Sequence, residues 1–235
     1  MVATQREFVC LANSKKHGER CIAGKLVGGA PNGVWYRPVS NRGSRGISEN
    51  EASYQTGGSV KALDIVSIWD TAKHQHVFQQ ENYIIDETQK WVKSGEFFLA
   101  NLSQLVDTPV SLWESNYSST SGLNDRVPER LLTQARSTLY LIRPDGNVSV
   151  KVDAEGKQWN NHKISVRATF GYQGVNYALS LTDIPAEAHF LNKGVGTYVL
   201  NDINYLTISL SEIHTNVPNY VPGQGYGYKV IAGIF

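Results

Sequence analysis

Cationic side chains are concentrated near the beginning of the sequence, in a pattern that favours contact with phosphate. Residues 8–46 contain seven Lys and Arg but a single acid, Glu19, which gives 7 − 1 = +6. The 235-residue chain has a formal net charge of +1, so the remainder carries 1 − 6 = −5. Such a local excess creates a positive field on a protein that is nearly neutral as a whole. The seven residues are Lys15, Lys16, Arg20, Lys25, Arg37, Arg42 and Arg45.

Two aromatic residues, Trp35 and Tyr36, lie within this basic stretch. Single-stranded nucleic acid needs cations that follow its phosphates and rings on which its bases stack. Neighbouring residues on a strand face opposite sides, so we expect one ring on the ligand side and the other in the core. The predicted nucleic-acid site consists of Lys15, Lys16, Arg20, Trp35, Tyr36, Arg37, Arg42 and Arg45.

The same stretch allows other interpretations. The charges could solvate an exposed sheet face, with some of them paired to Glu49 and Glu51, or they could form a surface for a protein or small ligand. The RGSRG segment at residues 42–46 could hold a mononucleotide or second messenger, because glycine lets the backbone approach a ligand and arginine suits phosphate. This segment is not a Walker A loop, since the Gly-x4-Gly-Lys-Ser/Thr pattern is absent.

Signatures of catalysis and metal binding are absent from the sequence. It contains no HExxH, CxxC or GxSxG pattern, and the pair His74 and His76 falls short of the three or four ligands of a metal site. Cys10 and Cys21 are expected to be reduced thiols on neighbouring strands. We therefore expect no catalytic residue, no metal and no cofactor.

Two later segments have both a structural and a functional interpretation. Asp125 could cap a following helix, and Arg126 could pair with Glu129 or a neighbouring carboxylate. The polar run at residues 118–121 could form a loop that touches a partner. The Gly/Tyr-rich residues 223–228 are expected to form a tight turn into the last strand, with an aromatic stacking surface as the alternative.

In the first third of the chain, the sequence pattern predicts three strands, a short helix and two more strands. Ser48 and Glu51 have the spacing of a capping box, which predicts a helix over residues 48–55. This order is typical of an oligonucleotide-binding (OB) barrel, with a β-sandwich as the alternative. The expected strands are residues 7–13, 20–27, 34–40, 62–69 and 77–85.

The last hundred residues repeat this order, and the middle differs. We predict helices at residues 96–106 and 127–136, separated by an irregular stretch at 109–124. In the final part the expected strands are residues 137–143, 148–152, 163–172, 175–182, 205–210 and 226–235, with a helix at 185–191. The prediction is a mainly β protein with two OB-like barrels in tandem: residues 1–90, a helical and irregular connector at 91–136, and residues 137–235.

Composition indicates a globular protein rather than a membrane or disordered one. Hydrophobic residues make up 41% and aromatic residues 10%, enough apolar surface to offset chain entropy. No apolar run approaches the roughly 18–20 residues of a membrane span, and the polar first residues do not resemble a secretion signal. We expect the protein in the cytoplasm.

Segments along nearly the whole chain resemble the dual OB-containing domain family. They are REFVCLANSKKHGERCIAG (6–24), WYRPVSNRGS (35–44), LDIVSI (63–68), QQENYIID (79–86), SLW (111–113), GLNDRVPE (122–129), LYLIRP (139–144) and VNYALSLTD (175–183). The resemblance implies two OB modules, a bacterial origin and a nucleic-acid or genome-defence context, and it implies no catalytic residue. The expected function is a non-enzymatic accessory protein that binds single-stranded DNA or RNA. The alternatives are an adaptor whose OB units bind a partner protein, and a nucleotide-sensing or nucleotide-hydrolysing protein.

Overall fold

The chain forms two compact units in a computed structural model that describes residues 3–16, 18–28, 33–155, 163–215 and 220–235. The first unit is Met1–Val106 and the second is Asp107–Phe235, so the division falls inside the stretch that we predicted as a connector. None of the described helices has the length and apolar character of a membrane-crossing segment.

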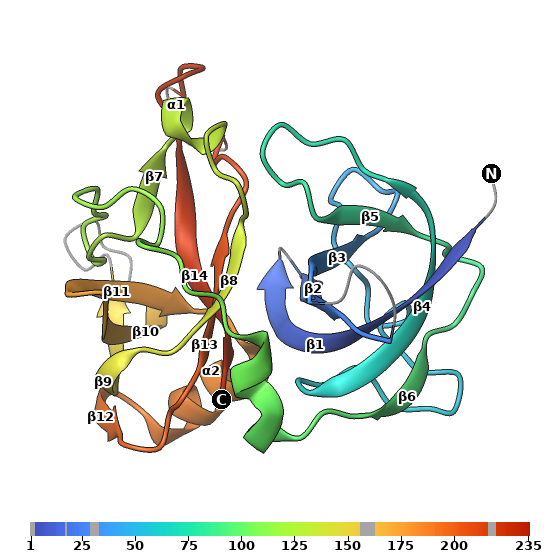
Figure 1. The fold of residues 1–235 in the computed structure, drawn as a ribbon. Helices are drawn as coiled ribbons and strands as arrows, with labels where there is room; N and C mark the ends of the chain where they lie inside the picture. The colour runs from blue at the N-terminus through green and yellow to red at the C-terminus, as the bar shows by residue number, and fades with distance from the viewer. Residues whose placement is uncertain (1–2, 17, 29–32, 156–162, 216–219) are drawn as a thin grey trace. The chain divides into compact units, whose positions relative to one another are not determined.

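Five strands of the first unit close into a barrel (Figure 1). The strand order is β1-β2-β3-β5-β4, and β4 pairs again with β1; β3 and β5 are parallel and the other neighbours are antiparallel. A sixth strand, β6, extends the sheet beside β4. This closed order is that of an OB barrel and not of a β-sandwich. The strands are β1 (Thr4–Lys16), β2 (Glu19–Leu26), β3 (Trp35–Val39), β4 (Asp64–Lys73), β5 (Asn82–Ile85) and β6 (Val92–Glu96).

The barrel closes because β1 pairs with two different strands. Its first half pairs with β4 and its second half with β2, with a register shift between Cys10 and Ala12 where the strand bends. A Cβ at residue 24 would lie 1.9 Å from the carbonyl oxygen of Val9, so only glycine lets β1 and β2 cross here. Phe8, buried in the core, belongs to the apolar run that makes β1 a strand.

Two helix predictions in the first unit are corrected. Ser48 and Glu51 do exchange the hydrogen bonds of a capping box, but residues 48–55 form turns, because Glu51 also binds Arg42 and the chain reverses at Gly57 and Gly58. The helix predicted at 96–106 is a shorter 3₁₀ helix, η1 (Leu99–Leu105), which buries Leu102 and Leu105.

The second unit repeats the OB order with its fourth strand divided. Strands β9, β10 and β11 form an antiparallel meander, and the chain then enters helix α2. After α2, β12 pairs with β9, β13 pairs with β14, and β14 runs parallel to β11. The strands are β7 (Arg126–Pro128), β8 (Leu139–Ile142), β9 (Asp145–Glu155), β10 (Lys163–Tyr172), β11 (Val175–Leu181), β12 (Gly196–Leu200), β13 (Leu206–Leu210) and β14 (Tyr226–Ile234).

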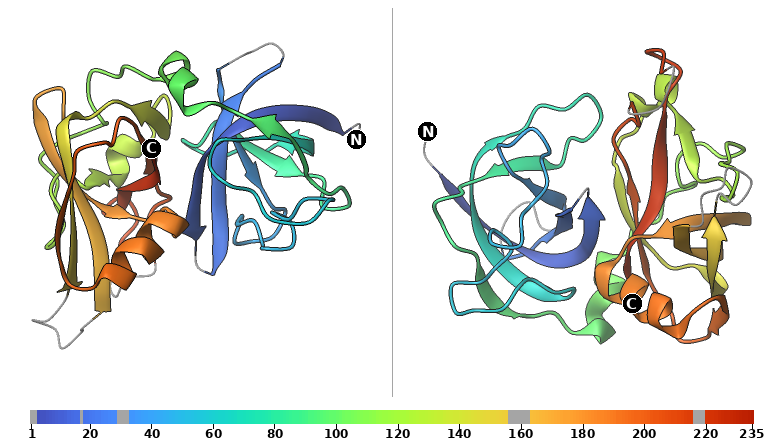
Figure 2. Two further views of the ribbon diagram at one scale, coloured as in Figure 1. Left: turned by 90° about the horizontal axis from the view of Figure 1, so that it is seen from below. Right: turned by 180° about the vertical axis from the view of Figure 1, so that it is seen from behind.

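Helix α2 (Ile184–Lys193) packs against β9 and β10 (Figure 2). Its Phe190 lies in the core. It begins as its sequence predicts, since the Asp183 carboxylate accepts the N–H of Ala186 and Pro185 occupies the first turn, where a missing N–H costs nothing.

Two further predictions in this unit are wrong. The helix expected at 127–136 is a single turn, α1 (Glu129–Leu132), because residues 126–128 instead form β7 and pair with the start of β14. Its N-cap is Pro128, so Asp125 does not cap it. The strand expected to open this barrel is β8, which pairs only with β13, and the role of first strand belongs to β9.

Candidate nucleic-acid interface

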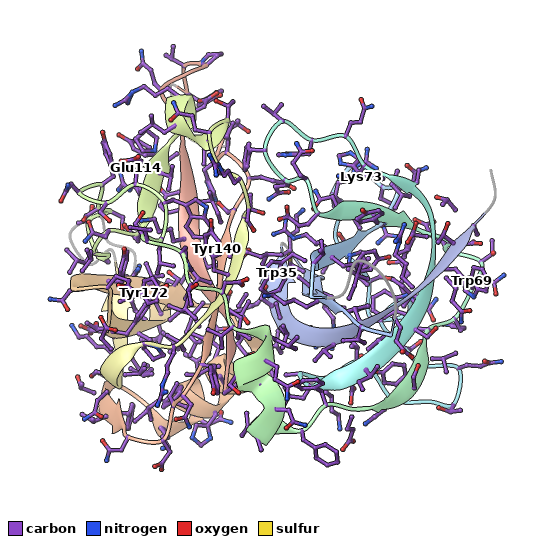
Figure 3. All side chains as sticks on the ribbon, viewed as in Figure 1. Trp35, Trp69, Lys73, Glu114, Tyr140 and Tyr172 are labelled. Carbon is purple, nitrogen blue, oxygen red and sulfur yellow. The ribbon has the colours of Figure 1, made fainter. Side chains whose placement is uncertain are left out.

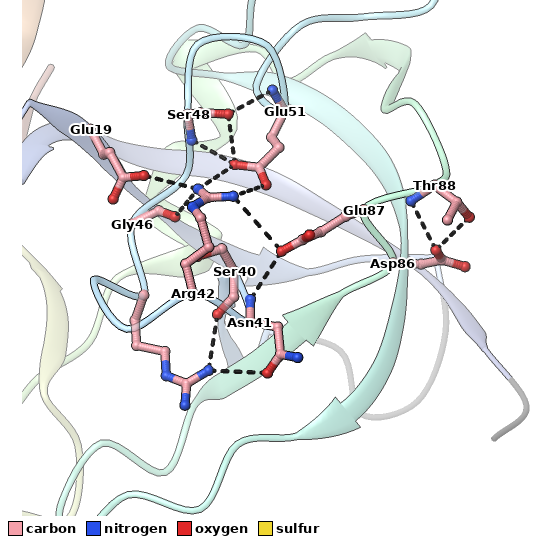
Figure 4. A network of polar contacts seen from close by, with 11 residues as sticks. Glu19, Ser40, Asn41, Arg42, Gly46, Ser48, Glu51, Asp86, Glu87 and Thr88 are labelled. Atoms are coloured by element: carbon pink, nitrogen blue, oxygen red, sulfur yellow. Dashed lines mark hydrogen bonds and ion pairs between the residues drawn. The ribbon is translucent and has the colours of Figure 1, made fainter.

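Carboxylates bind three of the arginines in the predicted first-unit site, namely Arg20, Arg42 and the buried Arg37. Arg20 makes a two-pronged pair with Glu49, at 2.7 and 2.6 Å. Arg42 donates to Glu51 at 2.7 Å and to Glu19 at 2.9 Å, and Glu87 lies 3.8 Å away (Figure 4). The hydrogen bonds that Arg42 donates to Glu51 raise the pKa of Arg42 above its ordinary value, against the opposing effect of burial. These cations are already neutralised within the protein.

Both aromatic residues of the predicted site are buried, which corrects the expectation that one ring would face a ligand. Tyr36 is completely buried in the barrel, and its hydroxyl donates to Asp70 at 3.2 Å. Trp35 is only 8% exposed and lies amid neighbouring side chains (Figure 3), with the Lys25 ammonium 5.3 Å from its ring centre. Arg37, on the same strand, is 3% exposed and pairs with Glu81 at 3.2 Å. Both faces of β3 are therefore covered.

The remaining predicted residues do not complete a groove around these rings. Lys15 is exposed and Lys16 partly exposed at the end of the hairpin between β1 and β2. Arg45 donates to the carbonyl of Ser40 and to the side chain of Asn41. In the RGSRG segment, a Cβ on Gly46 would lie 2.3 Å from the Glu19 carboxylate, so this glycine serves packing of the loop.

A different cationic and aromatic cluster lies in the second unit, where β7 meets β14. The guanidinium of Arg126 lies 5.1 Å from the ring centre of Tyr226 and 5.7 Å from that of Tyr228. Residues two apart on a strand share a face, so β14 presents both rings to the arginine. Nε of Arg126 has no hydrogen-bond partner, and no described carboxylate forms an ion pair with this partly exposed side chain.

Neighbouring residues extend this cluster. The exposed ring of His214 meets Tyr228 edge to face at 5.5 Å. Arg130 is exposed and donates to the Tyr117 hydroxyl at 3.2 Å, and the N–H of Arg126 donates to the Tyr117 carbonyl at 3.1 Å. We call these six residues the Arg126 surface: Tyr117, Arg126, Arg130, His214, Tyr226 and Tyr228.

Glu129, an acid three residues after Arg126, is bonded to other partners. It accepts from the N–H of Gly225 at 2.9 Å and from the Tyr220 hydroxyl at 3.1 Å, which fastens α1 to the loop before β14. The hydrogen bonds from the backbone at Gly225 lower its pKa. The predicted pairing of Arg126 with Glu129 is therefore wrong, and the Arg126 surface keeps its positive charge.

Residues 114–125, here called the strap, lead into β7 and hold the Arg126 surface. Asp125 is buried, and its carboxylate accepts from the N–H and hydroxyl of Ser119 at 2.7 and 2.6 Å. Leu123 exchanges two backbone hydrogen bonds with Ala178 of β11. The strap and β7 thus fill the space where β11 and β14 diverge, since those two strands pair only at Ser180 and Leu181. The predicted irregular stretch at 109–124 is confirmed apart from this bridge.

The sequence model of the dual OB-containing domain matches residues 6–234. The chain belongs to this family. The match spans both units, and the two barrels agree with the two OB modules that the family description names. No curated protein and no solved structure matches the chain.

Within this dual OB-containing domain, one residue of the Arg126 surface, His214, lies in a connection that OB barrels use for ligands, and the arginine and the rings of Tyr226 and Tyr228 lie beside it on β7 and β14. OB ligands contact strands two and three and the loops after strands one and four. In the second unit, residues 211–225 connect the divided fourth strand to β14, the fifth, and His214 lies in this connection. The described residues contain no group of three His, Cys, Asp or Glu side chains suited to a metal ion. The cluster is equipped for binding through charge and stacking.

Sequence reasoning offered an aromatic stacking surface at residues 223–228 only as an alternative, and it did not connect these rings with Arg126. Residues 226–228 read Tyr-Gly-Tyr, which places two rings on one strand face and a glycine on the other. A Cβ on Gly227 would lie 3.0 Å from Leu132 and from the Ser211 carbonyl, so the glycine face packs against the protein while the rings face outward. The role of Arg126 depends on β7 pairing with a strand about a hundred residues away, which no local pattern indicates.

Proposed function

We propose that this protein is a single-stranded nucleic-acid-binding module whose contact surface is the Arg126 surface of the second unit. The observation that carries the proposal is the guanidinium of Arg126, placed between the rings of Tyr226 and Tyr228 with no carboxylate partner among the described residues. The OB fold of the family supports a binding role, and the position beside the loop before the fifth strand supports this location.

The chemistry of the surface matches an unpaired strand. A guanidinium binds phosphate in two-pronged fashion, and with no described carboxylate bound to it Arg126 keeps its donors other than the buried Nε for a ligand. Tyr226, Tyr228 and His214 supply flat rings on which bases stack, a contribution of about 1–3 kcal/mol per base. Stacking on a protein ring requires a base whose face is free, so the proposal favours single strands over duplexes.

The first-unit cations are weaker candidates for the same role. A phosphate that approached Arg20 or Arg42 would have to displace Glu49, or Glu19 and Glu51. Separating these pairs would cost most of what the new contacts gain, since both sides are charge-assisted hydrogen bonds.

The test is fluorescence anisotropy with labelled oligo(dT) and oligo(rU), from about 25 to 200 mM salt. The wild-type protein is expected to bind, with log K falling by about 0.7 per log unit of salt for each phosphate contacted. Arg126→Ala is expected to weaken binding by about tenfold and to reduce the salt slope. Arg143→Ala removes an exposed arginine outside the surface and is the matched control.

Two results would count against the proposal. One is the lack of measurable binding at about 50 mM salt, where phosphate contacts are strong. The other is equal affinity for the wild-type protein and Arg126→Ala, combined with a loss in an Arg20→Gln/Arg42→Gln variant. That pattern would indicate that the binding site lies in the first unit instead.

A further inference from the structure

A single residue of β14, Lys229, is bonded to both ends of the strap. Its side-chain Nζ donates to the carbonyl of Glu114, the first residue of the strap, at 2.6 Å (Glu114 is labelled in Figure 3). Its backbone N–H donates to the carbonyl of Asp125, the last residue of the strap, at 2.9 Å. The next residue of the chain is Arg126. Lys229 therefore closes the strap into a loop immediately beside the arginine of the proposed site.

The ammonium group of Lys229 is almost completely buried, with 1% of the residue exposed. It lies 5.2 Å from the ring centre of Tyr177, and no described carboxylate forms an ion pair with it. A buried charge held by one carbonyl and one ring is incompletely compensated. Because Met would fill the same space without a charge, the position does not require lysine for packing.

Arg126 is attached to the strap on one side and to β14 on the other. Its N–H donates to the carbonyl of Tyr117, inside the strap, and it pairs with Tyr228 across the β7–β14 ladder. Trp113, just before the strap, and Asn116 and Asn124 within it have positive φ angles of 57°, 71° and 52°, which residues other than glycine adopt at a cost. The two bonds from Lys229 hold the ends of this segment, in addition to its bonds to β11 and within itself, so the placement of Arg126 depends in part on the closure.

We propose, on the basis of the function proposed above, that Lys229 is a positioning residue for Arg126 and that its protonation state regulates the affinity of the Arg126 surface for single-stranded nucleic acid. The charged ammonium makes a stronger hydrogen bond to the Glu114 carbonyl than a neutral amine, and it alone is attracted to the face of Tyr177. Loss of the proton weakens closure of the strap and lets Arg126 move away from Tyr226 and Tyr228.

The electrostatic surroundings place this change near neutral pH. Burial lowers the pKa of Lys229 to about 7, and attraction to Asp125 and Glu114 offsets only part of the effect. Asp125 is itself shared with Arg167, at 3.4 Å, which limits its hold on the lysine. The lysine is charged below this pKa and neutral above it, so affinity is expected to fall as the pH rises from 6 to 8.

The test compares Lys229→Met and Lys229→Gln with the parent protein. All three carry His214→Asn, so that a change of affinity with pH cannot come from the histidine of the Arg126 surface. Oligo(dT) affinity is measured at pH 6, 7 and 8, and hydrogen–deuterium exchange of peptides covering residues 114–125 is compared between proteins at each pH without nucleic acid. Thermal unfolding confirms that each variant is folded.

The parent is expected to lose affinity by about tenfold from pH 6 to pH 8, and Lys229→Met to bind weakly with no such dependence. Exchange in the strap is expected to be faster in Lys229→Met than in the parent at pH 6, with Lys229→Gln between them. Unchanged strap exchange in Lys229→Met would overturn the inference whether or not nucleic acid binds, as would a pH dependence equal to that of the parent. A parent that binds no oligonucleotide at any pH would instead defeat the proposed function.

Discussion

The Asp125 carboxylate occupies the space that a side chain at residue 122 would need. A Cβ on Gly122 would lie 1.9 Å from Oδ2 of Asp125, closer than any two such atoms can approach. Asp125 cannot withdraw without losing both hydrogen bonds from Ser119. The absence of a side chain at residue 122 and the position of the Asp125 carboxylate therefore depend on each other, and the conformation of the strap depends on both.

Gly122→Ala is expected to destabilise the second unit by about 1–3 kcal/mol, because the carboxylate must shift and leave buried partners unsatisfied. Urea denaturation at pH 7 measures the loss. Gly43→Ala is the control, since a Cβ there meets no atom within 4 Å, and it is expected to leave the free energy of unfolding nearly unchanged. Equal stabilities for the two variants would show that the strap adapts to the larger residue.

Asp183→Asn is expected to stabilise the protein at neutral pH. Burial raises the pKa of Asp183 to about 6 from 3.8, so the folded state binds more protons than the unfolded state between these values. Stability contributed by this group therefore falls as pH rises from about 4 to 6. Asparagine keeps an oxygen for the N–H of Ala186 and removes the buried charge, a gain of up to about 3 kcal/mol.

The measurement for Asp183 is urea denaturation at pH 4 and pH 7. Asp183→Asn should gain more, relative to the wild-type protein, at pH 7 than at pH 4. Asp183→Ala is the comparison variant, because it also removes the buried charge but loses the cap as well, so at pH 7 it is expected to be about 1 kcal/mol less stable than Asp183→Asn. Losses of similar size in both variants at pH 7 would contradict the explanation.

Arg42→Met is expected to make the protein less sensitive to acid. Burial raises the pKa of Glu51, but the hydrogen bonds from Arg42 and Ser48 outweigh burial and leave it below 4.5. A carboxylate with a lowered pKa contributes stability that is lost as the pH falls through that pKa. Without Arg42 this contribution shrinks, and at pH 7 the exposed pair is worth about 1 kcal/mol or less.

The check for Arg42 is the difference in unfolding free energy between pH 7 and pH 3.5. It should be smaller in Arg42→Met than in the wild-type protein. Arg45→Met is a matched control, because Arg45 contacts a carbonyl and an amide rather than a carboxylate, and its acid sensitivity should equal that of the wild-type protein. An unchanged pH dependence in Arg42→Met would argue against this network.

Tyr36→Phe and Tyr226→Leu are expected to separate stability from binding. Tyr36→Phe removes a buried hydroxyl that donates to Asp70, so it should lose about 1 kcal/mol of stability and no affinity for oligo(dT). Tyr226→Leu should lose about tenfold in affinity with little change in stability. Urea denaturation and fluorescence anisotropy on the same preparations test both variants. A loss of affinity in Tyr36→Phe with none in Tyr226→Leu would favour a binding site in the first unit.

The OB order was predictable because each barrel strand carries a recognisable apolar run or alternation. β1, β4, β10 and β11 appeared close to their observed places for this reason. Local signals failed where a distant partner decides the conformation. Ser48 and Glu51 form the hydrogen bonds of a helix start, yet Glu51 is held by Arg42 and the helix does not follow. Residues 126–128 resemble a helix start and are drawn into a ladder with β14.

The pairing of the predicted first-unit cations could not be foreseen for a similar reason. The basic stretch is real in the sequence, but its neutralising acids Glu49, Glu51 and Glu81 lie beyond residue 46 and come close only after folding. Arg126 shows the converse, because an acid stands three residues away and is held by Gly225 and Tyr220 instead. The sequence shows how many charged side chains a segment has, but the fold decides which of those charges remain available to a ligand.

The incomplete pairing of β11 with β14 has a consequence for how this chain can be divided. The second barrel is completed by residues 123–128, which precede its first strand, β9, in the sequence. A fragment that starts at residue 137 would expose the unbonded edges of both strands and leave Lys229 without its two carbonyl acceptors. The autonomous C-terminal piece therefore starts before the strap, and shorter fragments are expected to aggregate through those open edges.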